Sequence, residues 1–133
     1  RGLSVDFGGS WILPRLVGLQ QAKRLVMLAE TIDAQEAYEL GLVTYLVEPA
    51  ELDEHTSTLA QRLAAGPPAA LSQSAAMLER HTSLSLREAL DNEARSQAVN
   101  FATDATDAVR AFVEKREPIF TGEWAVPGAT RVE

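Results

Sequence analysis

The sequence predicts a mostly helical chain with one or two strands. Apolar residues recur at helical spacing over residues 19–29 and again through most of the chain after residue 51. Two pairs, Asp33 with Glu36 and Ser85 with Glu88, have the spacing of a capping box and so mark helix starts. In contrast, only residues 43–47 alternate in the way that is typical of a strand.

The first fifty residues predict a glycine-rich loop, three helices and a strand. Ser10 is expected to cap a short helix that Gly18 ends, and a second helix follows over residues 19–29. The helix that opens after Asp33 is expected to run to Gly41. The strand over residues 43–47 then stops at Pro49, which cannot donate a ladder hydrogen bond.

The rest of the chain predicts helices alone. They are expected over residues 51–65, 69–80, 86–101 and 104–116, with prolines or capping residues at their ends. The predicted organisation is therefore a first region over 1–50, a helical region over 51–122 and a loose tail over 123–133, which is rich in small and polar residues.

Charge and composition exclude several classes of function. The formal net charge is −7, which disfavours a helical DNA-binding regulator or any other nucleic-acid partner, since their affinity comes from clustered Lys and Arg. The chain has no cysteine, and His55 and His81 have no second ligand at metal spacing, so no metal site is predicted. No apolar run approaches the ~20 residues of a transmembrane helix, and no membrane partner is expected.

Three segments together resemble the enoyl-CoA hydratase/isomerase (crotonase) family. The first runs from Gly2 to Gly18 and contains Asp6, Gly8-Gly9 and Trp11. The second, Ala34 to Val43, has the pattern Ala-x-x-Ala-x-x-x-Gly-Leu-Val, and the third is Ala111 to Phe120, with Glu-Lys-Arg-x-Pro at its centre. Their order and spacing match the family up to about Gly122.

The resemblance implies an α/β fold of repeated strand-strand-helix turns, followed by a helical carboxy-terminal region. This chain would be the carboxy-terminal half, a fragment that lacks the oxyanion-hole strands and the two glutamates of hydratase members. The resemblance also implies a cytoplasmic enzyme of fatty acid metabolism, with trimers or hexamers or pairing with the missing amino-terminal half. Two departures are Val5, where many relatives have proline, and a stretch from Phe101 to Phe112 that is one residue short.

Asp6 is the candidate catalytic residue. The family forms an enolate next to a thioester, and a carboxylate can exchange the proton if desolvation raises its pKa. In isomerase-type relatives an aspartate at this position resembles the base, and Leu3, Phe7 and Trp11 could supply dry surroundings. The alternative is that Asp6 is a turn residue that hydrogen-bonds its own backbone beside the two glycines.

The candidate substrate-binding residues are Leu3, Gly8, Trp11, Phe112 and Lys115. Gly8 could let the backbone approach a ligand, although a turn that needs positive φ explains it equally. The resemblance implies that Phe112 and Lys115 reach the adenine and phosphates of coenzyme A. The alternatives are a helix-core role for Phe112 and complementation of the helix C-terminus by Lys115.

The sequence thus predicts a fragment of an acyl-CoA enzyme, an enoyl-CoA hydratase or isomerase. Its partner is an acyl-CoA substrate, and no cofactor is expected other than the coenzyme A of that substrate. The alternative is a catalytically inactive helical oligomerisation module, since one carboxylate without oxyanion donors is not a catalytic site.

Overall fold

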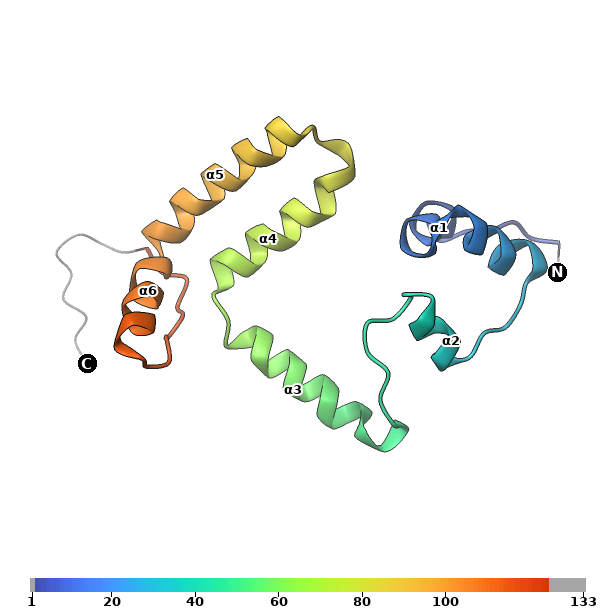
Figure 1. The fold of residues 1–133 in the computed structure, drawn as a ribbon, viewed down its shortest axis with the longest axis horizontal. Helices are drawn as coiled ribbons and strands as arrows, with labels where there is room; N and C mark the ends of the chain where they lie inside the picture. Colours follow the sequence, from blue (N-terminus) through green and yellow to red (C-terminus); the bar gives the residue numbers. More distant parts are fainter. Residues whose placement is uncertain (1, 125–133) are drawn as a thin grey trace. The chain divides into compact units, whose positions relative to one another are not determined.

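The computed structural model describes residues 2–124, which form helices joined by turns and irregular segments (Figure 1). The chain divides into two compact units, Arg1–His55 and Thr56–Glu133. The expected tail, 123–133, lies outside the described residues from residue 125 onward.

The first unit begins with α1 (Gly9–Leu28), which is broken at Gly18. Gly18 has φ 77° and ψ 158°, a backbone conformation that residues other than glycine rarely adopt. The helix is therefore two helices that meet at this residue. The prediction that Gly18 ends the first of these is confirmed. The prediction that Ser10 caps it is wrong, because the helix begins two residues earlier than that cap requires, and its N-cap, the left-handed Gly8, has no side chain to donate or accept.

Helix α2 (Ala34–Glu39) is bounded as its sequence predicts. The Asp33 carboxylate accepts a hydrogen bond from the Glu36 amide at 2.8 Å. At the other end Gly41 has φ 75°, and the amide of Leu42 donates to the Ala37 carbonyl at 2.9 Å, which is a Schellman motif. The Glu36 side chain completes no capping box, because it pairs instead with Arg24 of α1 at 2.5 Å.

The predicted strand over residues 43–47 is absent, and no strand occurs among residues 2–124. The segment is a bend and irregular chain that leads into a short 3₁₀ turn, η1 (Pro49–Glu51). A strand needs a neighbouring strand to accept its ladder hydrogen bonds, and none lies beside these residues in the described chain. Tyr45 instead packs on the His55 ring, with centroids 5.1 Å apart.

The second unit is built around a helical hairpin. Helix α3 (Leu52–Ala64) crosses the unit boundary, and α4 (Pro68–Arg80) is followed by the 3₁₀ turn η2 (His81–Ser83). Helices α4 and α5 (Leu86–Ala102) lie antiparallel and side by side (Figure 1). Between them the hydroxyl of Ser96, which is buried, donates to the amide oxygen of Gln73.

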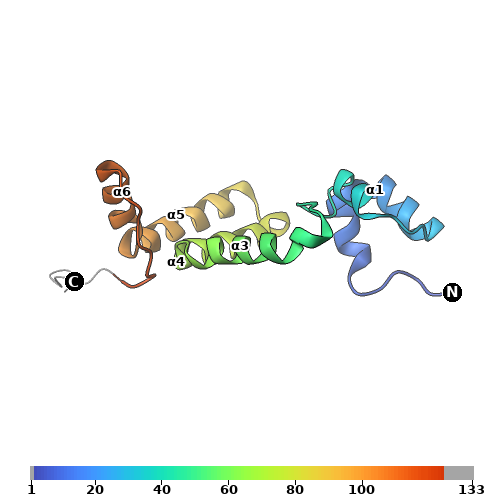
Figure 2. The same ribbon diagram turned by 90° about the horizontal axis from the view of Figure 1, so that it is seen from below.

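Helix α6 (Ala105–Glu114) follows α5 after a sharp turn at Thr103 and leaves the direction of α5 in both views (Figures 1 and 2). The Ser85–Glu88 capping box at the start of α5 is confirmed. The Glu88 amide donates to the Ser85 hydroxyl at 3.3 Å, and the Ser85 amide donates to the Glu88 carboxylate at 2.8 Å.

Little of the described chain is shielded from solvent. Among the described residues the buried apolar side chains are those of Ala22 and Ala111. Many large apolar side chains are exposed instead; they include Leu3, Phe7, Leu19, Met27, Leu28, Leu78, Leu86, Phe101, Phe112 and Val113. Such apolar surface is characteristic of an interface with further protein. No helix within residues 2–124 is both long and apolar enough to cross a membrane.

Candidate functional site

The Asp6 side chain lies on a tight turn at the start of α1. The Asp6 carbonyl accepts a hydrogen bond from the Gly9 amide at 2.8 Å, and the two residues between them, Phe7 and Gly8, have φ of 50° and 79°. Positive φ at two successive residues is the pattern of a type I′ turn, which rarely contains phenylalanine. The hydrogen bond of the turn holds the Asp6 backbone in place. The positive φ that the turn imposes on Phe7 costs free energy.

The expected dry surroundings of Asp6 are not formed by the described residues. Asp6 is exposed, and the relative exposures of Leu3, Phe7 and Trp11 are 85%, 102% and 54%. No other described element covers these side chains. An apolar wall around this carboxylate would have to come from other protein.

Gly8 provides the positive φ that the turn requires, and nothing lies within 4 Å of the position that a Cβ would occupy. The Gly9 amide is already bonded to Asp6, and the Trp11 and Ile12 amides both donate to the Gly8 carbonyl. Trp11 carries the Arg15 guanidinium over its ring at 3.9 Å, so this half-exposed indole already has a cationic neighbour.

A cavity of about 150 Å³ lies between the two halves of α1, close to this turn. Its wall is mostly apolar and includes Leu13, Leu19 and Val26. Gly9 and Ser10 line it, but Asp6 and Trp11 do not. The structure therefore does not bring the predicted site residues of the first unit together around one cavity.

The candidate ligand residues of the second unit lie at the end of α6. Phe112 has a relative exposure of 83%, and Lys115 is exposed with φ 55°. The neighbouring Arg116 pairs with Glu114 at 2.6 Å, whereas the ammonium group of Lys115 has no hydrogen-bond or ion-pair partner among residues 2–124. The helix end thus presents an aromatic ring and an uncompensated cation, which together suit a nucleotide.

Asp104, at the start of α6, is a residue that the sequence did not single out. Its relative exposure is 4%, and its carboxylate accepts hydrogen bonds from the amides of Thr121 and Gly122 at 2.9 and 2.8 Å. Aspartate at a helix start is ordinary capping chemistry, so the sequence alone carried no signal of a longer-range role.

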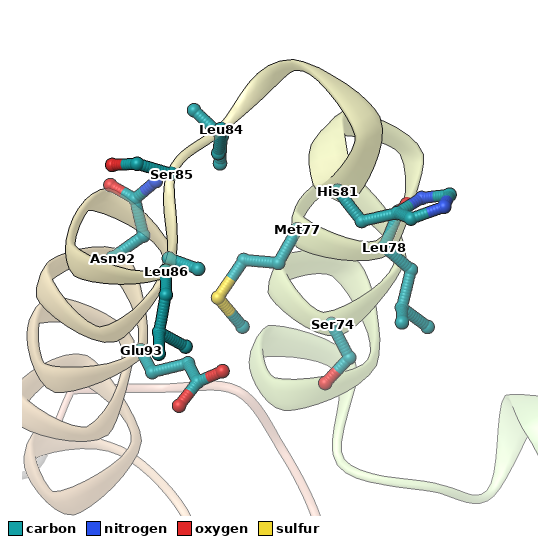
Figure 3. A pocket seen from close by; sticks show the side chains of 10 residues that line it. Ser74, Met77, Leu78, His81, Leu84, Ser85, Leu86, Asn92 and Glu93 are labelled. Carbon is teal, nitrogen blue, oxygen red and sulfur yellow. The ribbon is translucent and has the colours of Figure 1, made fainter.

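A cavity of about 500 Å³ lies at the closed end of the α4–α5 hairpin (Figure 3). Met77 from α4 and Glu93 from α5 point into the space between the helices, whereas His81 points away from α5 (Figure 3). The His81 Nδ1 lies 2.7 Å from the Leu78 carbonyl, which accepts its hydrogen bond. No group of three potential metal ligands occurs in the described part of the chain.

These features define a class: a helical chain with one carboxylate on a tight turn and a cationic, aromatic helix end. Comparison with known proteins gives the family. The sequence model described as enoyl-CoA hydratase/isomerase matches residues 1–123, and the chain belongs to this family.

Relatives of several activities are similar to this chain. The short-chain-enoyl-CoA hydratase of Clostridium acetobutylicum is 37% identical, over 87% of this chain and 45% of the relative. The trans-2-decenoyl-[acyl-carrier-protein] isomerase of Streptococcus mutans is 33% identical, over 92% of this chain and 47% of the relative. The chain therefore spans about half the length of these relatives.

Solved structures agree with this assignment. The enoyl-CoA hydratase of Bacillus anthracis superposes with a TM-score of 0.84 at 32% identity, over 92% of this chain and 48% of that one. The enoyl-CoA hydratase/isomerase of Cupriavidus metallidurans gives 0.82 at 34% identity, over 96% and 48%. These comparisons establish the family and the fold of its members, but they do not support the expected assignment of this chain to the carboxy-terminal half.

Proposed function

We propose that this chain is part of an enzyme that forms or protonates the enolate of an acyl thioester, as an enoyl-CoA hydratase or isomerase does. The observation that carries the proposal is the family match over residues 1–123, which includes Asp6 on its fixed turn. The proposed substrate is an acyl-CoA, and no cofactor is needed beyond the coenzyme A of that substrate. The proposed setting is the cytoplasm.

Asp6 is the proposed acid-base residue. In an isomerase cycle its carboxylate takes a proton from the carbon next to the thioester carbonyl or conjugated to it, which leaves the electron pair on the carbonyl oxygen as an enolate. The resulting carboxylic acid then returns the proton to a different carbon, and the double bond shifts. A rigid turn favours this transfer because it holds the carboxyl group in one place.

The enolate oxygen needs hydrogen-bond donors aimed at it, and these are usually the largest source of catalytic stabilisation. In this proposal the donors come from the half of the family's length that this chain does not match. In this proposal the same half also supplies the apolar cover that Asp6 lacks. The chain alone is therefore proposed to be inactive.

The experiment is the Asp6→Asn variant of the complete enzyme, with isomerase turnover and acyl-CoA binding measured separately. Loss of a general base is expected to lower kcat by about 10²–10⁴-fold while acyl-CoA still binds. Asp53→Asn, which removes the same charge from an exposed position in α3, is the control and is expected to keep full turnover. Unchanged turnover in Asp6→Asn would discard the assignment of Asp6.

A second candidate function is a helical oligomerisation module without activity. The exposed large apolar residues favour it, because they offer surface for self-association. An enoyl-CoA absorbance assay combined with sedimentation separates the two functions. If the complete protein forms a stable assembly in sedimentation and shows no turnover of enoyl-CoA, the module is favoured.

A further inference from the structure

Helix α6 and the segment that follows it form a closed loop. The chain leaves the end of α6 at Lys115 and returns to the start of the helix, where Thr121 and Gly122 meet Asp104. The Thr121 amide donates to Oδ1 of Asp104 at 2.9 Å, and the Gly122 amide donates to Oδ2 at 2.8 Å. The Thr121 hydroxyl adds a weaker contact to Oδ1 at 3.4 Å. We name residues 104–122 the α6 loop.

The closure of the α6 loop also contacts α4. Gly122 has φ 70°, and a Cβ at this position would lie 2.7 Å from Cγ of Pro68, the first residue of α4. A side chain at Gly122 would therefore be disfavoured both by the backbone conformation and by Pro68. The backbone at Gly122 is thus fixed by its hydrogen bond to Asp104 and by its close approach to Pro68.

The far end of the loop holds Lys115 in an uncommon conformation. With φ 55° it occupies the position after a helix at which glycine is the usual residue. The Lys115 amide donates to the Phe112 carbonyl at 3.2 Å, and the Arg116 amide donates to the carbonyl of the buried Ala111 at 3.0 Å. These two bonds fix the direction in which the chain leaves the helix.

We propose that Asp104 is a positioning residue that closes the α6 loop and so presents Phe112 and Lys115 together to the nucleotide end of the acyl-CoA substrate. The inference rests on the proposed function, because it takes these two residues as the ligand-binding end of the helix. Asp104 itself touches no ligand in this account. It acts through the returning segment, which prevents the left-handed Lys115 from relaxing to an ordinary helical conformation.

A carboxylate suits this role better than its amide. Both oxygens of Asp104 accept from backbone N–H groups, and a hydrogen bond to a charged acceptor is stronger than one between neutral groups. In Asp104→Asn the side-chain NH₂ faces an N–H donor, so one of the two bonds is lost and two donors meet in a buried place. The variant keeps the size of the side chain and changes its charge and its hydrogen bonding.

The first test is amide hydrogen exchange on the complete protein. In Asp104→Asn the amides of Thr121 and Gly122 are expected to exchange about tenfold faster or more, while amides in the α4–α5 hairpin keep their protection. Asp91→Asn, which removes the same charge from exposed α5 surface, is the control. Unchanged exchange at Thr121 and Gly122 in Asp104→Asn overturns the inference.

The second test compares an acyl-CoA with the same acyl group on pantetheine, which lacks the nucleotide. Asp104→Asn is expected to raise KM for the acyl-CoA about tenfold, with kcat and the KM for acyl-pantetheine unchanged. If both thioesters lose turnover equally, Asp104 is structural only and the positioning role fails. Should Asp104→Asn not fold, Gly122→Ala disrupts the same closure from the other side and is expected to give the same pattern.

A Lys115→Ala variant distinguishes the failure of the inference from the failure of the proposed function. If Lys115→Ala leaves the KM for acyl-CoA unchanged, Lys115 does not bind the nucleotide and the positioning role falls with it. The turnover of Asp6→Asn is independent of that result and tests the catalytic proposal alone.

Discussion

Positive φ marks the residues on which the candidate site depends. Phe7 and Lys115 are two of the three non-glycine residues with positive φ among residues 2–124, and each lies next to or at a predicted site position. Strained backbone persists only where the surroundings hold it. At Lys115 those surroundings are the bonds of the α6 loop, and at Phe7 they are the Asp6–Gly9 turn.

A substitution at Gly18 tests the cost of its backbone conformation alone, because an added Cβ would meet no other atom. Its φ of 77° and ψ of 158° are accessible almost only to glycine, and nothing lies within 4 Å of a Cβ built there. Gly18→Ala is expected to lower the free energy of unfolding by about 1–3 kcal/mol, measured by urea denaturation.

Gly41→Ala is the matched comparison, since Gly41 also has open space around it but lies in the left-handed helical region that other residues sometimes enter. Its expected cost is smaller, about 1–2 kcal/mol. Equal stability of Gly18→Ala and the wild type would show that the break in α1 does not depend on glycine.

Residues whose roles are local could be predicted from the sequence. Gly18, Asp33 and Ser85 act within four positions of themselves, and each behaves as its pattern indicates. The roles of Asp104 and Arg24 join positions 12–18 residues apart, and no spacing rule indicates such a contact. The prediction for Ser10 was wrong because Gly8 and Gly9 allow the helix to begin earlier.

At the level of elements, the clearest test concerns the start of α5. The Ser85 hydroxyl and backbone N–H hydrogen-bond the Glu88 carboxylate and lower the pKa of Glu88 below its ordinary value of 4.5. Ser85→Ala removes the cap and is expected to cost about 1 kcal/mol of stability, measured by thermal or urea denaturation. Ser72→Ala, on exposed α4 surface, is the control and is expected to be neutral.

The lowered pKa of Glu88 also gives a dependence on pH. The folded state prefers the charged carboxylate, so the capping box contributes fully above the ordinary pKa of 4.5 and its contribution falls as the pH drops below that value. The difference in stability between wild type and Ser85→Ala is therefore expected to shrink between pH 6 and pH 3. A constant difference would contradict a charged cap.

The helices could be predicted because neighbouring residues carry their periodicity and their caps. The strand predicted over residues 43–47 is absent, because a strand also depends on residues far away in the sequence. Alternating Val43, Tyr45 and Val47 indicate a strand only if another strand accepts the ladder bonds. The described residues include no such strand, so the segment is a bend and irregular chain. The dry site around Asp6 failed as a prediction for the same reason, since its cover is not among these residues.

At the scale of the whole molecule, the exposed apolar side chains dominate. Surfaces of this kind are normally covered by further protein, either a copy of this chain or the remaining part of the family fold. The chain in isolation is therefore expected to self-associate, and we expect sedimentation to give an assembly larger than one chain, a trimer or a hexamer if it follows the family resemblance. A monomer at high concentration would contradict this expectation.

The polar contact between Ser96 and Gln73 has a consequence for how the α4–α5 hairpin can pack. Apolar side chains along two helices tolerate sliding by one turn, because one methyl group replaces another. The hydroxyl of the buried Ser96 and the amide of the half-buried Gln73 do not, since a shift would leave both without their partner in the seam. This single pair therefore sets the alignment of α4 against α5, and with it the position from which α6 departs.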